Sequence, residues 1–245
     1  DLYAGPDDPR IEADGKWCGE QASAFARHRG KLEGMSAAEL FDAVRTLEDL
    51  NERAQKLIAF AYLFFSTRTQ DPAASALFQS QKELMSELHR DTLFFELEWT
   101  KIEDSRAQAL LSDPVLSGYR HFLESLRRYG PYLLSEPEER ILAEKEPAGA
   151  SAWSALFDKM LSQLKFGEKK RTESEVLSDL YNPEREIRRK AASELTEGLE
   201  SLLPALTHIF NTILLDKSID DRLRKYPNWL SARNLSNEAD DSMVQ

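Results

Sequence analysis

The sequence is poor in cysteine, and this shortage limits both its cross-links and its chemistry. Its 245 residues contain a single cysteine, Cys18. One thiol forms neither an internal disulfide nor a multi-thiolate metal cluster, which favours a reducing, cytoplasmic setting. We interpret Cys18 as a structural thiol, because no His–Asn/Asp partner motif of a thiol enzyme accompanies it.

Long apolar runs and basic tracts are also lacking. No stretch is apolar enough to cross a bilayer, and the opening DLYAGPDD lacks the basic and apolar segments of a secretion signal. Acidic residues outnumber basic ones by 43 to 32, which gives a net charge of −11. We therefore expect a cytoplasmic protein with no membrane and no nucleic acid as partner.

Catalytic signatures are absent as well. A zinc endopeptidase needs two imidazoles one helical turn apart with a glutamate beside the first, written H-E-x-x-H. The sequence has no such motif, and its histidines are widely spaced: His28, His89, His121 and His208. His121 and Glu124 form a close pair that fails to supply the inverted zinc motif. We interpret each histidine as solvated or capping, and predict no catalytic, cofactor-binding or metal-binding residue in this chain.

Ten glycines are too few and too scattered to form a phosphate loop, a nucleotide-binding turn or a nucleophile elbow. Basic side chains gather at one place: Arg185, Arg188, Arg189 and Lys190. Such a cluster is able to recognise a carboxylate or a phosphate. We favour the alternative, in which these cations pair with neighbouring glutamates.

Helical signals, in contrast, are abundant. The capping-box pattern, Ser or Thr followed three residues later by Glu, starts at Ser36, Ser135 and Thr172. Apolar residues after Ser36 recur at three- and four-residue steps, which predicts a helix of roughly eight turns. Asp71-Pro72 begins a second helix with the same period. Their short connection predicts an antiparallel pair.

Two stretches depart from this pattern. Residues 163–172 place Gly167-Glu168 between apolar and basic side chains, which predicts a small β-hairpin. The helix after Pro183 is predicted to kink or break at Gly198 and Pro204. The expected fold class is therefore mostly α: a multi-helix lobe with antiparallel long helices and one small β-hairpin.

A family resemblance extends over nearly the whole chain. Its stretches, in order, are DLYAGPDDPRIEAD, FARHRGKLEGMSAAEL, YGPYLLSEPEERILAEK, SAWSALFDKMLSQLKF, TESEVLSDLYNPEREIRRKAASEL and FNTILLDKSIDDRLRKYPNWLSARNLSNEADDSMVQ. They resemble the N-terminal portion of the oligoendopeptidase F branch of the thimet-oligopeptidase-like zinc metallopeptidases. Since the chain lacks an initiator Met and stops at SNEADDSMVQ, a pattern like the opening of a helix, we expect both ends to be cut.

The resemblance implies one lobe of a zinc-dependent endopeptidase that hydrolyses short peptides within a channel. It implies zinc as the cofactor of the parent protein, and an oligopeptide substrate and a missing catalytic region as partners. The zinc ligands of the family belong to that region and match no position here, so the segment alone is predicted to be inactive and to bind no zinc. The implied regions are an N-terminal helical region (1–112), an oligopeptidase F-type region (113–182) and the start of the catalytic region (183–245).

Charge mixed with aromatic side chains marks the segment after Asp216. Arg222, Tyr226 and Trp229 are the predicted substrate-binding residues, since Arg pairs with a peptide carboxylate and the aromatic rings line a groove. The alternative is that Tyr226 and Trp229 anchor a loop to the core, because aromatic side chains pack more often than they bind.

Two further readings stay open. One alternative is that the chain is a non-catalytic helical scaffold that binds peptides or proteins. The last-ranked hypothesis is an enzyme with an unrecognised site, because no acid–base pair converges in the sequence. A lobe that docks onto a catalytic region requires an exposed apolar surface larger than the few hundred Å² usual on monomers.

Overall fold

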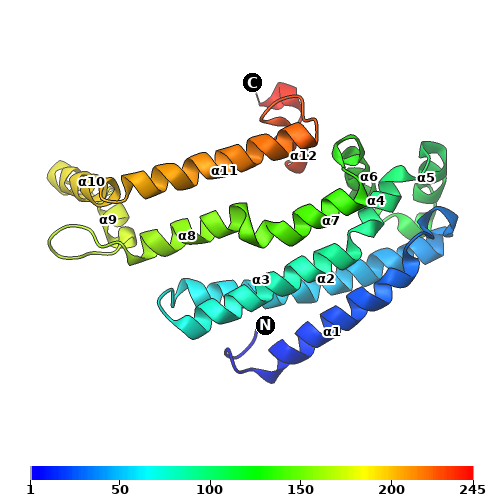
Figure 1. Ribbon diagram of the computed structural model, residues 1–245, viewed down its shortest axis with the longest axis horizontal. Helices are drawn as coiled ribbons and strands as arrows, with labels where there is room; N and C mark the ends of the chain where they lie inside the picture. Colours follow the sequence, from blue (N-terminus) through cyan, green and yellow to red (C-terminus); the bar gives the residue numbers. More distant parts are fainter. Residues whose placement is uncertain (1, 245) are drawn as a thin grey trace. The chain divides into compact units, whose positions relative to one another are not determined.

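The computed structural model describes residues 2–244, which form helices joined by short turns (Figure 1). The chain divides into two compact units. Unit 1 contains Asp1–Pro147 and Asp220–Gln245, and unit 2 contains Ala148–Ile219. The three regions predicted from the sequence stay a prediction, and the compact units divide the chain at other positions.

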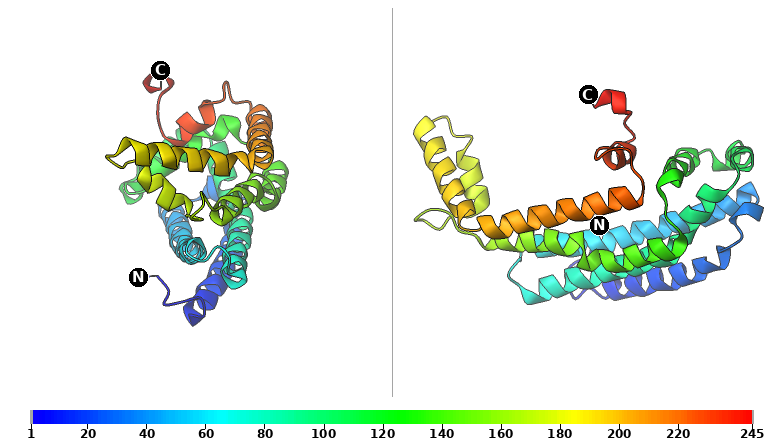
Figure 2. Two further views of the ribbon diagram at one scale, coloured as in Figure 1. Left: turned by 90° about the vertical axis from the view of Figure 1, so that its left-hand side faces the viewer. Right: turned by 45° about the horizontal axis from the view of Figure 1, so that its top comes forward.

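Unit 1 is built on three long helices that lie side by side (Figures 1 and 2): α1 Pro9–Phe25, α2 Ala37–Ser66 and α3 Pro72–Thr92. Ser36 and Glu39 form the predicted capping box at the start of α2, and Asp71 caps α3. Because a short turn joins α2 to α3 and the two helices pack together, they form the predicted antiparallel pair.

Shorter helices complete unit 1. They are α4 Phe94–Lys101, α5 Asp104–Leu111, α6 Arg120–Arg128, α7 Glu136–Lys145 and α12 Ser231–Ser236, with 3-10 turns at Ala26–His28, Leu32–Gly34, Pro114–Leu116, Gly130–Tyr132, Glu146–Ala148 and Asp241–Met243. Trp99 of α4 is fully buried in the larger apolar core, and its indole nitrogen donates a hydrogen bond of 2.8 Å to the Leu123 carbonyl of α6. This bond satisfies the polar atom of a large core side chain.

Unit 2 contains α8 Ala150–Gln163, α9 Glu173–Asp179, α10 Arg185–Glu200 and most of α11 Leu203–Leu223. Its small core consists of Phe166, Val176 and Ala191. The predicted break near Pro204 is confirmed, because α10 and α11 are bent by 74° and Pro204 lies in the first turn of α11. Within residues 2–244, no single helix meets the length and apolarity of a membrane span, whereas this bent pair meets them jointly.

The β-hairpin predicted at residues 163–172 is wrong. Within the described residues this stretch holds one isolated antiparallel bridge, between Phe166 and Arg171, and no strand. Helix α8 continues through Gln163 and Thr172 caps α9, and residues 167–170 between them form a turn that leaves one bridged pair. Gly167, with a φ of 66°, lies in the turn that brings the chain back.

Gly198 lies inside α10, where a glycine lowers the stability of the helix. Tertiary packing explains why a glycine is present at this position. A Cβ atom at this position would lie 2.5 Å from Cδ1 of Phe166. The Phe166 ring is fully buried and forms the centre of the unit 2 core. Because Gly198 has no side chain, the Phe166 ring packs directly against the backbone of α10.

Substitution of Gly198 by alanine should destabilise the protein by about 1–3 kcal/mol, because the added methyl group collides with a buried ring. Urea denaturation measures this change. Gly19→Ala in α1 is the matched control, since nothing lies within 4 Å of its Cβ position, and it should stabilise by up to about 1 kcal/mol. Equal effects of the two substitutions would contradict the packing argument.

Candidate functional site

The segment that contains the predicted substrate-binding residues is fixed by an arginine that sequence reasoning missed. Arg224 donates two hydrogen bonds to Glu139 of α7, from Nη1 to Oε1 at 2.6 Å and from Nη2 to Oε2 at 2.9 Å. Its Nε also donates to Oδ1 of Asp220, at 2.9 Å. The forked geometry of guanidinium suits two carboxylates at once. We call Arg224, Glu139 and Asp220 the carboxylate clamp.

The clamp lies in a partly buried, low-dielectric setting. Burial by itself would raise the pKa of Glu139, but hydrogen bonds from Arg224 and from the Leu134 amide at 2.9 Å hold that pKa below its ordinary value. Glu96 of α4 behaves in the opposite way, because burial and the negative charge of Glu139 raise its pKa against the pull of Arg224. The Glu139 carboxylate is thus held in its charged form, whereas the Glu96 carboxylate is biased towards its neutral form.

The Tyr226 side chain packs against another aromatic ring of unit 1. Its ring stacks on Tyr132, with centroids 4.3 Å apart and planes at 23°. Lys225 adopts a left-handed φ of 61°, and the Tyr226 amide donates to the Asp221 carbonyl at 2.9 Å. This turn accompanies the stacking of the Tyr226 ring on Tyr132 within unit 1, as in the anchoring alternative.

The other two predicted contact residues are exposed. Trp229 has 72% of its surface open to solvent, and Arg222 is exposed in the last turn of α11. Exposure leaves both side chains available to a ligand. The substrate-binding role of Arg222, Tyr226 and Trp229 stays a prediction. The spacing of Asp220 and Arg224, one helical turn apart, is a sequence signal for this pair alone and gives no indication of Glu139.

The histidines occupy separate places. His121 pairs through Nε2 with Glu238 at 2.9 Å, rather than with Glu124. His208 meets Trp153 edge to face, with centroids 5.2 Å apart. Among residues 2–244, no group of three or more His, Cys, Asp or Glu side chains is arranged to hold a metal ion.

The basic cluster of α10 is engaged with its own neighbours. Arg189 pairs with Glu186, and the ammonium of Lys190 lies 3.8 Å from Glu194. Arg188 donates instead to the Asn182 carbonyl at 2.7 Å. These contacts support the glutamate-pairing interpretation for Arg189 and Lys190.

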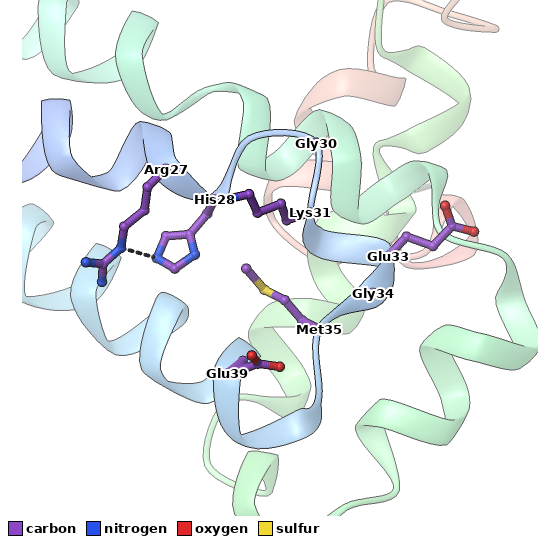
Figure 3. A pocket seen from close by; sticks show the side chains of 8 residues that line it. All are labelled: Arg27, His28, Gly30, Lys31, Glu33, Gly34, Met35 and Glu39. Carbon is purple, nitrogen blue, oxygen red and sulfur yellow. Dashed lines mark hydrogen bonds between the residues drawn. The ribbon is translucent and has the colours of Figure 1, made fainter.

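A surface pocket of about 720 Å³ lies at the connection between α1 and α2 (Figure 3). Its lining mixes basic side chains, Arg27 and Lys31, with acidic ones, Glu33 and Glu39, and includes His28. Burial and the two nearby cations lower the pKa of His28. Since Glu39 is already bound to the start of α2 in its capping box, the pocket assembles no acid–base pair.

Comparison with known proteins shows what this chain resembles. The model of the Oligopeptidase F family matches residues 98–166. The Oligoendopeptidase F homolog of Borreliella burgdorferi is 23% identical over 195 residues, which cover 78% of this chain and 33% of that protein. Oligopeptidase PepF of Bacillus subtilis is 24% identical over 234 residues, which cover 90% of this chain and 35% of that protein. The resemblance to the N-terminal portion of oligoendopeptidase F is confirmed. The chain spans about a third of the length of these curated relatives.

Solved structures show the same fold. The crystal structure of oligoendopeptidase-F from Enterococcus faecium matches with a TM-score of 0.82 at 18% identity, over 96% of this chain and 48% of that chain. A putative peptidase from Chlamydophila abortus matches with a TM-score of 0.57, also at 18% identity, over 92% of this chain and 39% of that chain. The helices of this chain therefore share the fold of the matching parts of these two structures.

Replacement of Arg224 by glutamine should lower the free energy of unfolding by about 3 kcal/mol, because it leaves the buried Glu139 carboxylate without its cation. Urea denaturation at neutral pH measures the loss. Arg222→Gln, two residues away at an exposed position, should change stability by less than about 0.5 kcal/mol. If the two variants lost the same free energy of unfolding, the clamp would make no contribution to stability.

Proposed function

We propose that this chain is the N-terminal lobe of a zinc-dependent endopeptidase that hydrolyses short peptides. The observation that carries the proposal is the agreement between the Oligopeptidase F family match and two curated relatives named as oligopeptidases, whose similarity covers 78% and 90% of the chain. The cytoplasmic location expected from the sequence belongs to the same proposal.

The zinc site belongs, in this proposal, to the catalytic region that follows the lobe in the parent protein. The sequence here has no H-E-x-x-H motif, and the described residues offer no cluster of metal ligands. These residues therefore do not fit a catalytic metal, and the segment alone is proposed to be inactive. The metal would activate a water molecule for attack on the scissile carbonyl.

The lobe itself has a steric and orienting role. It supplies one wall of a channel that admits an extended peptide and excludes a folded protein. Within unit 1 the carboxylate clamp fixes the turn that carries Trp229, and the exposed indole offers an apolar face to a peptide side chain. Arg222 provides a cation for a peptide carboxylate. Selectivity for short peptides follows from exclusion.

The protein purified from its natural source tests this function. It should cleave short internally quenched peptides and leave folded proteins intact, and it should carry about one zinc ion per chain. Removal of the metal by a chelator should abolish cleavage, and added zinc should restore it. Peptide binding without zinc and without cleavage would reject the peptidase and favour the non-catalytic scaffold.

Trp229→Ala in that active protein should raise KM by about two- to tenfold, the factor given by the loss of one aromatic contact of about 0.5–1.5 kcal/mol. The melting temperature should change little, because the side chain is exposed. Tyr226→Ala is a less specific probe, since it also removes the ring stack on Tyr132.

Tyr181→Ala is the matched control for this substitution. Its side chain is 90% exposed and lies in unit 2, between α9 and α10. Both variants should keep the melting temperature of the parent protein, and only Trp229→Ala should alter KM. Unchanged kinetics for Trp229→Ala would reject its contact role.

A further inference from the structure

Helix α4 contains a carboxyl group that has no hydrogen-bond donor. Four of the eight residues of this helix are buried, among them Phe95 and Leu97 on either side of Glu96. The other acidic residue of the helix, Glu98, accepts a hydrogen bond of 2.7 Å from the Gly30 amide. Glu96 is half-buried, and no donor among residues 2–244 reaches its carboxyl group. A charged carboxylate in such a position lacks the compensation that burial requires.

The charges that act on Glu96 belong to the carboxylate clamp. Glu139 repels a charged Glu96, and Arg224 attracts it. The donors of Arg224 are committed elsewhere, since Nη1 and Nη2 bind Glu139 and Nε binds Asp220. Nη1 also lies 3.4 Å from the Tyr132 carbonyl. One guanidinium thus binds two carboxylates and leaves a third without a partner. Arg224 and its two partners already sum to a charge of −1, and ionisation of Glu96 makes the total −2.

The other titratable and charged groups in this region are paired with one another or act on Glu139. The charge of a protonated His89 on α3 favours the charged form of Glu139. Tyr129 and Tyr132 lie beside Tyr226. The elements around α4 and α7 contain three ion pairs: Arg127 with Asp104, Arg90 with Asp91, and Arg29 with Glu136. Glu96 and His89 are therefore the two groups that an experiment has to separate.

We propose that the carboxylate clamp is a pH-sensitive latch for residues 220–244, closed while Glu139 is charged and Glu96 is neutral. Protonation of Glu139 at low pH removes the negative charge that the fork of Arg224 binds. Ionisation of Glu96 at higher pH places a repelling charge beside the same contact. Either change weakens the hold on the turn after α11. This inference does not depend on the proposed peptidase function, because every group in it belongs to unit 1.

The pKa shifts of the two carboxyl groups have the signs that a latch requires. Burial and the charge of Glu139 raise the pKa of Glu96 above 4.5, the ordinary value of a glutamate. Its stabilising contribution is therefore complete below pH 4.5 and is lost as the pH rises through the folded-state pKa. Glu139 is buried, but its hydrogen bonds lower its pKa, so its contribution is lost as the pH falls. The latch holds within a window of pH and loosens on both sides.

Hydrogen exchange of the complete protein at a series of pH values tests the latch. The segment 224–236 reports it, because the Tyr226 amide donates to the Asp221 carbonyl in the turn that the clamp holds. Division by the exchange rate of the denatured chain at the same pH removes the intrinsic pH dependence. Protection of this segment in the wild-type protein should decline as the pH rises from about 5 to about 9.

Glu96→Gln keeps the shape of the side chain without its charge, so its protection should stay constant over the same range. It should also melt at a higher temperature than the wild-type protein at about pH 8, since the buried repulsion is absent. Glu96→Leu, which is apolar and uncharged, should give the same constant protection. Glu124→Gln, at an exposed position of α6, is the matched control and should keep the wild-type decline.

Two results would overturn the latch. One is constant protection in the wild-type protein, and the other is the same decline in Glu96→Gln and Glu96→Leu as in the wild-type protein. His89→Gln separates the remaining titrating group and should keep the wild-type decline. If His89→Gln lost the pH response and Glu96→Gln kept it, the response would belong to His89 and the role of Glu96 would be rejected.

Discussion

The contact between Arg224 and Glu139 is the constraint on which the candidate site depends. These residues are 85 positions apart, and the chain between them leaves unit 1 and forms all of unit 2 before it returns. Closing so long a loop costs conformational entropy, which a single neutral hydrogen bond would barely offset. A charged, forked contact to two carboxylates is stronger and fixes direction. It holds the returning chain in one place, so the turn that carries Tyr226 and Trp229 has a defined position within unit 1.

The two units differ in how they are stabilised. Unit 1 buries large side chains such as Trp99 and Phe94 among several helices, whereas unit 2 depends on a small core around Phe166. That small core requires the close approach of a ring to Gly198 and of Gly167 to Glu194. Loss of one side chain from such a core removes a larger share of its stabilisation.

Local signals predicted the helices well, because their causes are local. The capping boxes at Ser36 and Thr172 are formed by residues three positions apart, and the long apolar period after Ser36 defines α2. The hairpin prediction failed because apolar and basic residues around Gly167 fit a tight turn as well as two strands. The clamp was missed because Glu139 and Arg224 come together only in the folded chain. No pattern in the sequence gives a contact between such distant residues.

Helix α11 combines both kinds of constraint. Arg224, directly after its carboxyl-terminal end, is bound to Glu139 within unit 1, while the residues of α11 up to Ile219 belong to unit 2. The apolar period of this helix is visible in the sequence, but a period alone predicts one buried face and does not identify the element that buries it. Among these residues Ile209 is buried, whereas Phe210 and Leu214 are exposed. The apolar period of α11 therefore predicts the helix itself, whereas the distant contact of Arg224 with Glu139 fixes the turn that follows it.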